Sequence, residues 1–284
     1  MPLVQLTSVL ADAQGGHYAV PSFNVVTLEM LEAVLRAAET KRSPLIIGLA
    51  ARHIGTVDPW LIAGAVQKGA SRASVPVVFH LDHAESLEAI ELGIAIGCTS
   101  VMIDGSKLSL EENIRLTGEV VSYSHAKNVS VEAELGAVGG IEGEVAGGES
   151  LNLYTDPGQA EYFTSQTGID ALAIAIGTVH GLYRSAPNLR FDLLERIARA
   201  TNVPLVLHGG SGLSAEDFAR LIGLGITKIN VFTELAVRST EKLRENLRDR
   251  PAPVSIADVI KGVADDLSNI AVGLMVTFRS AARV

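Results

Sequence analysis

The sequence predicts an α/β protein of the TIM-barrel class, a (β/α)8 barrel with an additional helical segment at its carboxyl end. Short apolar runs alternate with longer amphipathic runs along the whole chain, which is the pattern of repeated strand–helix units. A length of 284 residues suits one barrel, because such barrels commonly use about 250 residues. We therefore expect a single domain over residues 1–284.

Each expected element has its own sequence signal. The apolar runs predict strands over 18–24, 44–50, 75–82, 99–104, 129–135, 171–176, 203–208 and 227–231. Periodic segments predict helices over 6–14, 28–39, 59–73, a segment ending near 93, 110–127, 157–167, 192–201, 215–223, 233–248 and a tail over 255–279. Thr27 and Ser214 stand at N-cap positions. The glycine- and glutamate-rich segment 136–150 has no period and is expected to be a mobile loop.

A doubly wound open sheet is the alternative fold. It would normally carry a glycine-rich dinucleotide turn after its first strand, and residues 24–27 (Asn-Val-Val-Thr) contain no glycine. The composition, 48% hydrophobic and 19% charged, indicates a large buried core for either fold.

Charge and cysteine usage limit the classes of function. A net charge of −9 argues against a nucleic-acid surface but allows a phosphorylated substrate, because backbone N–H groups can bind an anion. The lone Cys98 cannot form an internal disulfide, and the first residues show no signal peptide, so we expect a cytoplasmic protein. We expect no membrane association, because no apolar run reaches the roughly 18 residues of a spanning helix.

Ionisable residues follow the strand expected over 75–82. Val75–Phe79 runs directly into His80, Asp82 and His83, and polar groups at the carboxyl end of a buried strand usually contact a ligand. Asp82 and His83 are the first candidates. The alternative is that they hydrogen-bond to each other or cap the next helix.

The other strand ends are predicted to deliver further polar groups to the same face. They carry Asp104, Glu132, Glu134, His180, His208 and Asn230. Three neutral imidazoles around an open position form a typical catalytic zinc site, although a single loop histidine more often only donates a hydrogen bond. Glycines near His180 and His208, and the helix start after Asn230, indicate a phosphate site unless they are ordinary tight turns.

Six segments resemble a known family over essentially the full chain. They are His80–His83, Ser100–Asp104, Val131–Gly136, Ala175–Gly181, Leu207–Gly212 and Ile229–Val231, and they resemble the class II, metal-dependent ketose-bisphosphate aldolases that include fructose- and tagatose-1,6-bisphosphate aldolases.

The resemblance implies a role for each matching residue. His83, His180 and His208 would hold Zn2+, with Asp104 and Glu134 near an alternative position for a second divalent ion. Asp82 would move the proton of the C4 hydroxyl, and Glu142 would exchange the proton at the nucleophilic carbon of dihydroxyacetone phosphate. Asn24 would lie close to the substrate. The triose phosphate, with Na+ or K+ nearby, would be held by Gly181, Gly209, Gly210, Ser211, Asn230, Val231, Phe232 and Thr233.

The implied activity is reversible aldol cleavage of a ketose 1,6-bisphosphate, of the fructose or tagatose type, to dihydroxyacetone phosphate and an aldehyde such as glyceraldehyde 3-phosphate. This activity belongs to carbohydrate metabolism such as glycolysis, and the family suggests a homodimer or homotetramer. A ketose 1-phosphate, or another sugar phosphate with a different aldehyde half, is the alternative substrate.

Three departures from the family pattern favour that alternative. The serine or threonine–glycine element after the second strand is replaced by residues 45–53, the Asp-Pro-Arg-Lys segment by 251–255, and the small Gly-Ser-Ala ending by 277–282. These changes affect the aldehyde half of the substrate. Replacement anion ligands could come from Arg52, His53, Arg184 or Arg279, unless these are solvated surface residues.

Three other functions compete. A Schiff-base aldolase would use Lys228, which the sequence places near the start of its strand, away from the carboxyl face. A metal-dependent hydrolase often carries two histidines on its first strand, and 18–24 has none. A catalytically silent subunit is disfavoured by the intact set of candidate residues.

Overall fold

Eight parallel strands form a closed barrel in this computed structural model, which describes residues 3–145, 154–183, 187–248, 250 and 253–284, with the backbone alone for 141–145. Around the barrel the strand order is β1-β10-β9-β7-β5-β4-β3-β2. The strands are β1 (Val20–Asn24), β2 (Leu45–Ala50), β3 (Val77–Ala84), β4 (Ser100–Ile103), β5 (Ser130–Leu135), β7 (Ala171–Ile174), β9 (Leu205–Leu207) and β10 (Ile226–Val231). The predicted TIM barrel is confirmed.

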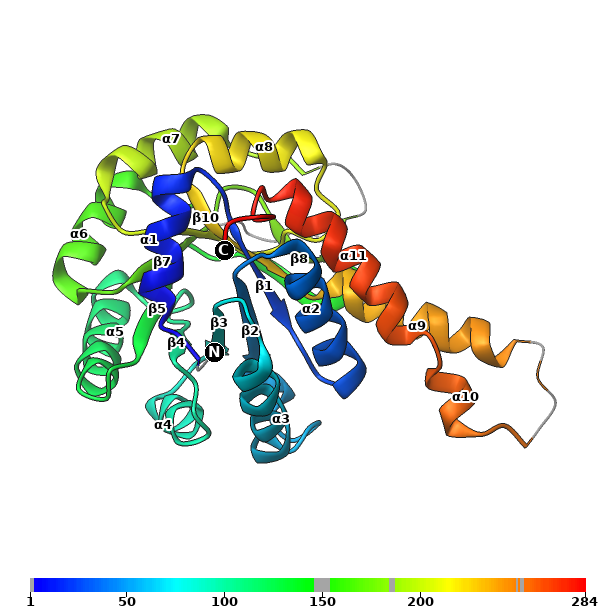
Figure 1. Cartoon of the computed structure of the whole chain (residues 1–284). Coiled ribbons are helices and arrows are strands. Elements are labelled where there is room, and N and C mark those ends of the chain that lie inside the picture. Colours follow the sequence, from blue (N-terminus) through cyan, green and yellow to red (C-terminus); the bar gives the residue numbers. More distant parts are fainter. Residues whose placement is uncertain (1–2, 146–153, 184–186, 249, 251–252) are drawn as a thin grey trace.

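Helices surround the barrel (Figure 1). They are α1 (Leu6–Gly16), α2 (Leu28–Lys41), α3 (Pro59–Arg72), α4 (Leu87–Ala95), α5 (Leu110–His125), α6 (Pro157–Thr167), α7 (Phe191–Ala200), α8 (Ala215–Gly223), α9 (Thr233–Leu247), α10 (Ile256–Ile260) and α11 (Val263–Thr277), with a short 3-10 turn η1 (Ala51–His53) after β2. Thr27 and Ser214 cap α2 and α8 through their side chains, as predicted. None of these helices is both long and apolar enough to cross a bilayer.

Apolar side chains fill two layers. The larger cluster lies between strands and helices, where parallel strands are covered on their outer face. A second cluster lies inside the barrel, where α1 packs its Leu6, Val9 and Leu10 against inward residues of six or more strands and closes the amino end. The interior is therefore solid at that end, and a ligand can enter only at the carboxyl end.

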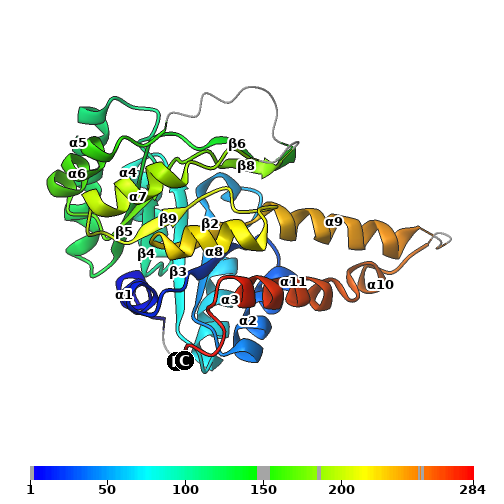
Figure 2. The ribbon, with the colours of Figure 1, turned by 90° about the horizontal axis from the view of Figure 1, so that it is seen from above.

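A second, two-stranded sheet covers the carboxyl end and corrects one prediction. Gly139–Val145 (β6) pairs in parallel with Val179–Leu182 (β8), so about half of the segment expected to be a loop is a strand. Residues 146–150 lie outside the described residues. The glycine-rich sequence has no alternation, and its partner lies about 40 residues away, so the pairing left no local signal. Figure 2 shows β6 and β8 on the side of the molecule opposite the C-terminus.

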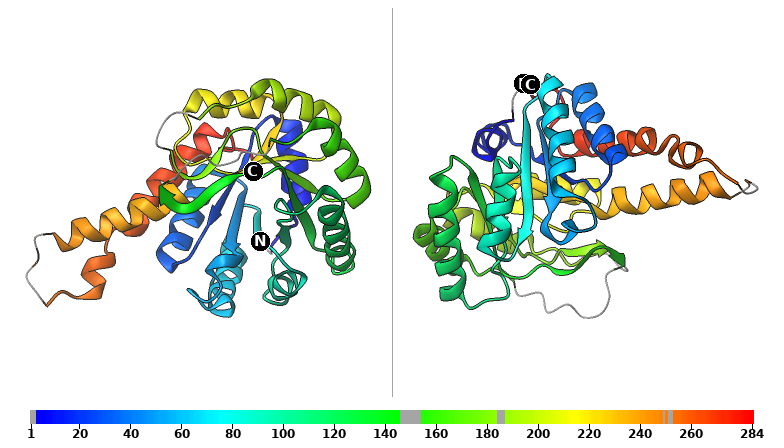
Figure 3. Two further views of the ribbon diagram at one scale, coloured as in Figure 1. Left: turned by 180° about the vertical axis from the view of Figure 1, so that it is seen from behind. Right: turned by 90° about the horizontal axis from the view of Figure 1, so that it is seen from below.

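The carboxyl-terminal helices form an arm. Helices α9, α10 and α11 extend beyond the barrel in both views of Figure 3, and α11 returns to pack along α2. The chain then ends beside the amino end of β1, where Ala19 N–H donates to Phe278 O. Arg279 follows at this opposite end of the barrel, so it is not placed to bind the substrate's aldehyde half.

Candidate active site

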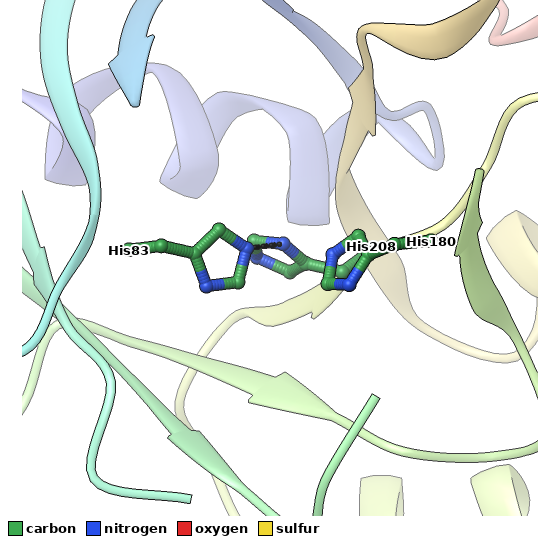
Figure 4. A group of neighbouring side chains, drawn as sticks. All are labelled: His83, His180 and His208. Carbon is green, nitrogen blue, oxygen red and sulfur yellow. Dashed lines mark hydrogen bonds between the residues drawn. The ribbon is translucent and has the colours of Figure 1, made fainter. Parts of the chain in front are cut away.

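Three histidines meet at the carboxyl end of the barrel. His83 comes from β3, His180 from β8 and His208 from the turn after β9, and their ring centroids lie 4.6 to 5.8 Å apart (Figure 4). One nitrogen from each ring lies within 4.8 Å of the others. The sequence predicted His180 at the end of a barrel strand, whereas the structure has it in β8 of the second sheet, next to β6.

A bulge in β3 explains how two consecutive residues reach one site. Successive residues of a regular strand point to opposite faces, so Asp82 and His83 should diverge. His83 instead has a left-handed backbone, with φ of 49°, and the β3–β4 register shifts between Leu81 and Ala84. Such bulges redirect side chains next to active sites. No local sequence signal marked this one.

Two carboxylates determine which ring nitrogen carries the hydrogen in His83 and in His208. His83 Nδ1 lies 3.0 Å from Asp104 Oδ2, and His208 Nε2 lies 3.0 Å from Glu132 Oε1. A carboxylate only accepts, so each of these nitrogens carries its ring's hydrogen. The remaining nitrogens, His83 Nε2 and His208 Nδ1, face each other at 2.9 Å, and both are then acceptors.

This donor set fits a metal ion. Two facing lone pairs repel unless they share a cation, and the third ring adds a further donor, because His180 Nε2 is buried without a hydrogen-bond partner among the described residues. Burial and then the neighbouring His83 lower the pKa of His180 well below its ordinary value, so the ring is neutral, as a metal ligand must be. Three imidazoles are the ligand set expected for zinc with an open coordination position.

A second cluster, which contains two carboxylates, adjoins the three histidines. Asp104 and Glu134 lie beside His83, and the three could hold another cation. Burial and the nearby Asp104 raise the pKa of Glu134 to about 8, and its Oε2 atom has no hydrogen-bond partner in the described part of the chain. Two carboxylates this close favour either a proton or a cation between them.

Asp82 is fixed between two amides. Asn24 Nδ2 donates to Oδ2 at 2.8 Å, and Asn230 Nδ2 donates to Oδ1 at 3.2 Å. Burial by itself would raise the pKa of Asp82, but His83, His208 and Lys228 outweigh it and hold the pKa below its ordinary value. The carboxylate is therefore ionised and held in one orientation. It lies next to the histidine cluster without belonging to it.

The predicted phosphate segments approach one another. Ser211 Oγ accepts from the N–H of Glu234 at 3.4 Å, which brings the turn after β9 to the amino end of α9. Gly209 has a positive φ of 68°, and a Cβ there would lie 2.4 Å from Val179 O, so only glycine allows this contact. Free N–H groups at a helix start suit an anion.

Tyr183 was not singled out from the sequence. Its hydroxyl accepts from Val179 N–H at 3.2 Å and donates to Gly209 O at 2.7 Å. It therefore joins the backbone beside His180 to the backbone beside His208. A tyrosine three residues after a candidate ligand was the only signal available.

A cavity of about 720 Å³ opens beside the histidines. Its wall includes Arg52, His83, Asp104, Lys107, Gly140 and His180. Arg52 also lies over the ring of Phe232, 6.0 Å from its centroid, and the ring of His53 is tilted against the same ring, with the centroids 5.0 Å apart. Arg184 and the side chain of Glu142 lie outside what the structure describes, although the backbone of Glu142 belongs to β6.

Glu132 differs from its expected position at the mouth, whereas Lys228 lies in the first half of its strand, away from the carboxyl end, as expected. Glu132 lies deeper in the barrel than Glu134, below the mouth, and contacts Lys228 Nζ at 2.7 Å. Lys228 is the third residue of β10 and points into the barrel, fully buried. The alternation of β5 and β10 could predict inward positions, but only the closed barrel brings the two together.

Fold and site together define a barrel enzyme with a histidine centre of the metal-binding type. The family described as class-II fructose-bisphosphate aldolase matches residues 4–283, and the chain belongs to this family. The 6-phospho-5-dehydro-2-deoxy-D-gluconate aldolase of Bacillus licheniformis is 45% identical over 256 residues, covering 88% of this chain and 86% of that protein. The fructose-bisphosphate aldolase of Geobacillus stearothermophilus is 42% identical over 288 residues, covering 100% and 99%.

Solved structures of aldolases are similar to this chain over almost its full length. The YdjI aldolase from Escherichia coli K12 matches with a TM-score of 0.88 at 37% identity, covering 99% of both chains. A fructose-1,6-biphosphate aldolase from Coccidioides immitis, titled putative, matches with a TM-score of 0.87 at 32% identity, covering 98% of this chain and 97% of that one. The protein is thus an aldolase, a carbon–carbon lyase.

Proposed function

We propose that this aldolase reversibly cleaves a ketose 1,6-bisphosphate, of the fructose or tagatose type, to dihydroxyacetone phosphate and an aldehyde such as glyceraldehyde 3-phosphate. The observation that carries the proposal is the ionised Asp82, held by Asn24 and Asn230 beside three convergent histidines. This is a base next to a Lewis-acid site, which is what the cleavage of a β-hydroxy ketone requires.

The proposed roles follow the geometry. His83, His180 and His208 hold one Zn2+, which when bound polarises the substrate carbonyl and stabilises negative charge on the departing triose. Asp82 accepts the proton of the C4 hydroxyl. The C3–C4 bond then breaks, C4 becomes the aldehyde carbon, and the electron pair remains on C3 of the triose.

Other residues complete the proposal. Glu142 on β6 returns a proton to the triose carbon, as the family resemblance implies. The triose phosphate lies at the start of α9, with Na+ or K+ nearby, held by Gly181, Gly209, Gly210, Ser211, Asn230, Val231, Phe232 and Thr233. Asp104 and Glu134 provide a second divalent position. The chain acts as one domain over 1–284 and assembles as a homodimer or homotetramer, which light scattering would measure.

Chelation and borohydride trapping test the reaction class. We expect inactivation by a chelator, recovery with zinc, and no reduced adduct when borohydride is added with substrate. Lys228 disfavours the Schiff-base alternative, because its amine is ion-paired with Glu132 inside the barrel. A borohydride adduct on Lys228, with activity surviving chelation, would contradict the proposal.

A second candidate substrate has a carboxylate at its distal end. The substrate in the name of the Bacillus licheniformis relative carries a carboxylate where fructose 1,6-bisphosphate carries its second phosphate. Arg52 on η1 is exposed in the wall of the cavity beside His83. A guanidinium can bind a carboxylate through two parallel hydrogen bonds, so Arg52 is suited to this end group.

Turnover of four substrates decides between the candidates. They are fructose 1,6-bisphosphate, tagatose 1,6-bisphosphate, a ketose 1-phosphate and 6-phospho-5-dehydro-2-deoxy-D-gluconate. If Arg52 binds the distal anion, Arg52→Gln should raise KM for the preferred acidic substrate about tenfold or more, and leave the ketose 1-phosphate unaffected. Lys107→Gln is the matched control, because it removes a positive charge from another part of the same cavity wall, where Lys107 contacts Glu85. Equal effects of both substitutions would exclude a specific role for Arg52.

A further inference from the structure

An ion pair lies inside the barrel directly behind His208. Lys228 Nζ contacts Glu132 Oε2 at 2.7 Å, and both side chains are fully buried. The other oxygen of Glu132 lies 3.0 Å from His208 Nε2. Lys228, Glu132 and His208 thus form a continuous chain from β10 through β5 to the turn after β9.

A buried ion pair is energetically unfavourable compared with apolar side chains in this space. Removing two charges from water carries a large free-energy penalty, and apolar residues of similar size often stabilise a protein as well or better. The neighbouring inward layer is apolar, with Val20, Ile46, Val78 and Val206 in one cluster. The barrel can therefore be packed without charges, and the pair requires another explanation.

Glu132 determines which nitrogen of His208 carries the hydrogen. As a carboxylate it can only accept, so His208 Nε2 must donate, and Nδ1 keeps its lone pair. Nδ1 points at His83 Nε2, 2.9 Å away, inside the three-histidine cluster. The Asn230 amide nitrogen, 3.4 Å from Nδ1, is also a donor facing that lone pair.

Lys228 in turn holds Glu132. An ammonium group only donates, so it occupies Oε2 and leaves Oε1 turned toward His208. His80 does not replace it, because His80 Nε2 lies 3.8 Å from Glu132 Oε2, while its Nδ1 contacts Ser100 Oγ at 2.9 Å. Without the ammonium, the carboxylate would be buried with one oxygen unpaired.

We propose that Lys228 and Glu132 are positioning residues that lock His208 in the tautomer with Nδ1 free to bind the metal. In this role Lys228 acts through Glu132, because its amine contacts Glu132 Oε2 and not His208. The inference rests on the metal site proposed above, and it gives a physical reason why His208 Nδ1 is free to bind an ion there. Groups that orient a histidine ligand in this way typically contribute 10- to 100-fold in metal affinity.

The tautomer can be measured in the unmodified protein. Histidine labelled with 15N gives different two-bond couplings for the two tautomers, and the His208 signal is assigned by its absence from His208→Asn. In metal-free protein we expect the hydrogen on Nε2, and after zinc addition a coordinated Nδ1. A hydrogen on Nδ1, or rapid exchange between the two forms, overturns the proposal.

The double variant Lys228→Met/Glu132→Gln tests the contribution to affinity. It removes both charges together, so no unpaired buried ion remains, and the glutamine amide can turn either its oxygen or its nitrogen toward His208. Zinc affinity, measured by competition with a chromogenic chelator, should fall 10- to 100-fold, and the His208 tautomers should mix. Affinity within threefold of the unmodified protein, with the tautomer retained, overturns the proposal.

Ser43→Ala is the matched control. Ser43 Oγ makes a buried hydrogen bond with Ser280 Oγ at 2.7 Å, close to the amino end of the barrel. Its loss should lower thermal stability and leave zinc affinity and the His208 tautomer unchanged. If the unmodified protein binds no zinc at all, the metal site itself is wrong, whereas a wrong tautomer with tight zinc binding refutes the positioning role alone.

Discussion

Asp82 shows how single residues acquire roles from their partners. Asn24 and Asn230 each donate to one of its oxygens, so the carboxylate has one orientation, and the neighbouring His83, His208 and Lys228 hold its pKa low despite burial. His83, the next residue, is turned into the same site by a left-handed backbone. Neighbours in the chain therefore serve different functions at one place.

Asp82→Asn tests the base. The amide keeps the size of the side chain but cannot accept the C4 hydroxyl proton, so kcat should fall about 10²- to 10⁴-fold. Zinc content, measured by mass spectrometry, should stay the same, because Asp82 is not in the histidine cluster. Retention of a tenth of the activity would exclude Asp82 as the base.

His80 should make the metal-free protein sensitive to acid. Burial, and then Lys228, lower its pKa from 6.5 to about 3. Below pH 6.5 the unfolded chain binds a proton that the folded protein does not, so the free energy of unfolding falls as the pH drops from 6.5 toward 3. At pH 5 this loss is about 2 kcal/mol.

Urea unfolding at pH 7 and pH 5 measures that loss. The decrease should be about 2 kcal/mol smaller in His80→Gln than in the unmodified protein. His17→Asn is the control, because His17 is exposed in the folded protein and hydrated in both states. A His80→Gln protein with the same pH dependence as the unmodified chain would show that His80 does not carry the effect.

At the level of elements, β8 and the turn after β9 form one unit. Gly209 packs against Val179, and Tyr183 joins the same two segments through its hydroxyl. The backbone on either side of His180 and His208 is therefore tied together. The alignment of two candidate ligands depends on contacts between segments that neither strand pattern reveals.

Gly209→Ala tests this unit. An alanine would need a positive φ, and its Cβ would meet Val179 O, so we expect a loss of about 1–3 kcal/mol in the free energy of unfolding. Zinc affinity and kcat should fall by more than tenfold. Gly223→Ala, near the end of α8 with open space around it, should leave both unchanged. Normal zinc affinity in Gly209→Ala would show that the contact between β8 and the turn after β9 does not align the two candidate ligands.

At the level of the whole molecule, the site joins parts from most of the barrel. Side chains from β3, β5, β10 and the second sheet, and from the turns after β4 and β9, belong to the histidine cluster or lie within 4.0 Å of it, and Asn24 of β1 donates to Asp82. A bound metal would connect β3, β8 and the turn after β9, and would stabilise only the folded state.

Removal of the metal should therefore lower stability as well as activity. At free zinc about 100 times the dissociation constant, binding contributes about 2.7 kcal/mol, so a chelator should lower Tm and zinc should restore it. His180→Ala is the control, and its Tm should respond much less to chelator or zinc. An unmodified protein whose Tm ignores zinc would contradict the three-histidine site.

The sequence by itself determined the eight barrel strands, the helices between them and their order. Helices α6 and α8 match their expected bounds, because the proline or serine starts and the apolar periodicity are local signals. Once eight strand–helix units imply a barrel, the convergence of Asp82, His83 and His208 at one end follows from topology.

Only the tertiary structure decided what depends on distant contacts. These are the β6–β8 pairing, the bulge at His83, the position of Arg279 at the far end, and the buried contact of Lys228 with Glu132. Each joins residues far apart in the chain or depends on a local backbone irregularity, and neither leaves a period in the sequence. The residues of the histidine cluster could be proposed from the sequence, but the groups that orient them appeared only when the barrel closed.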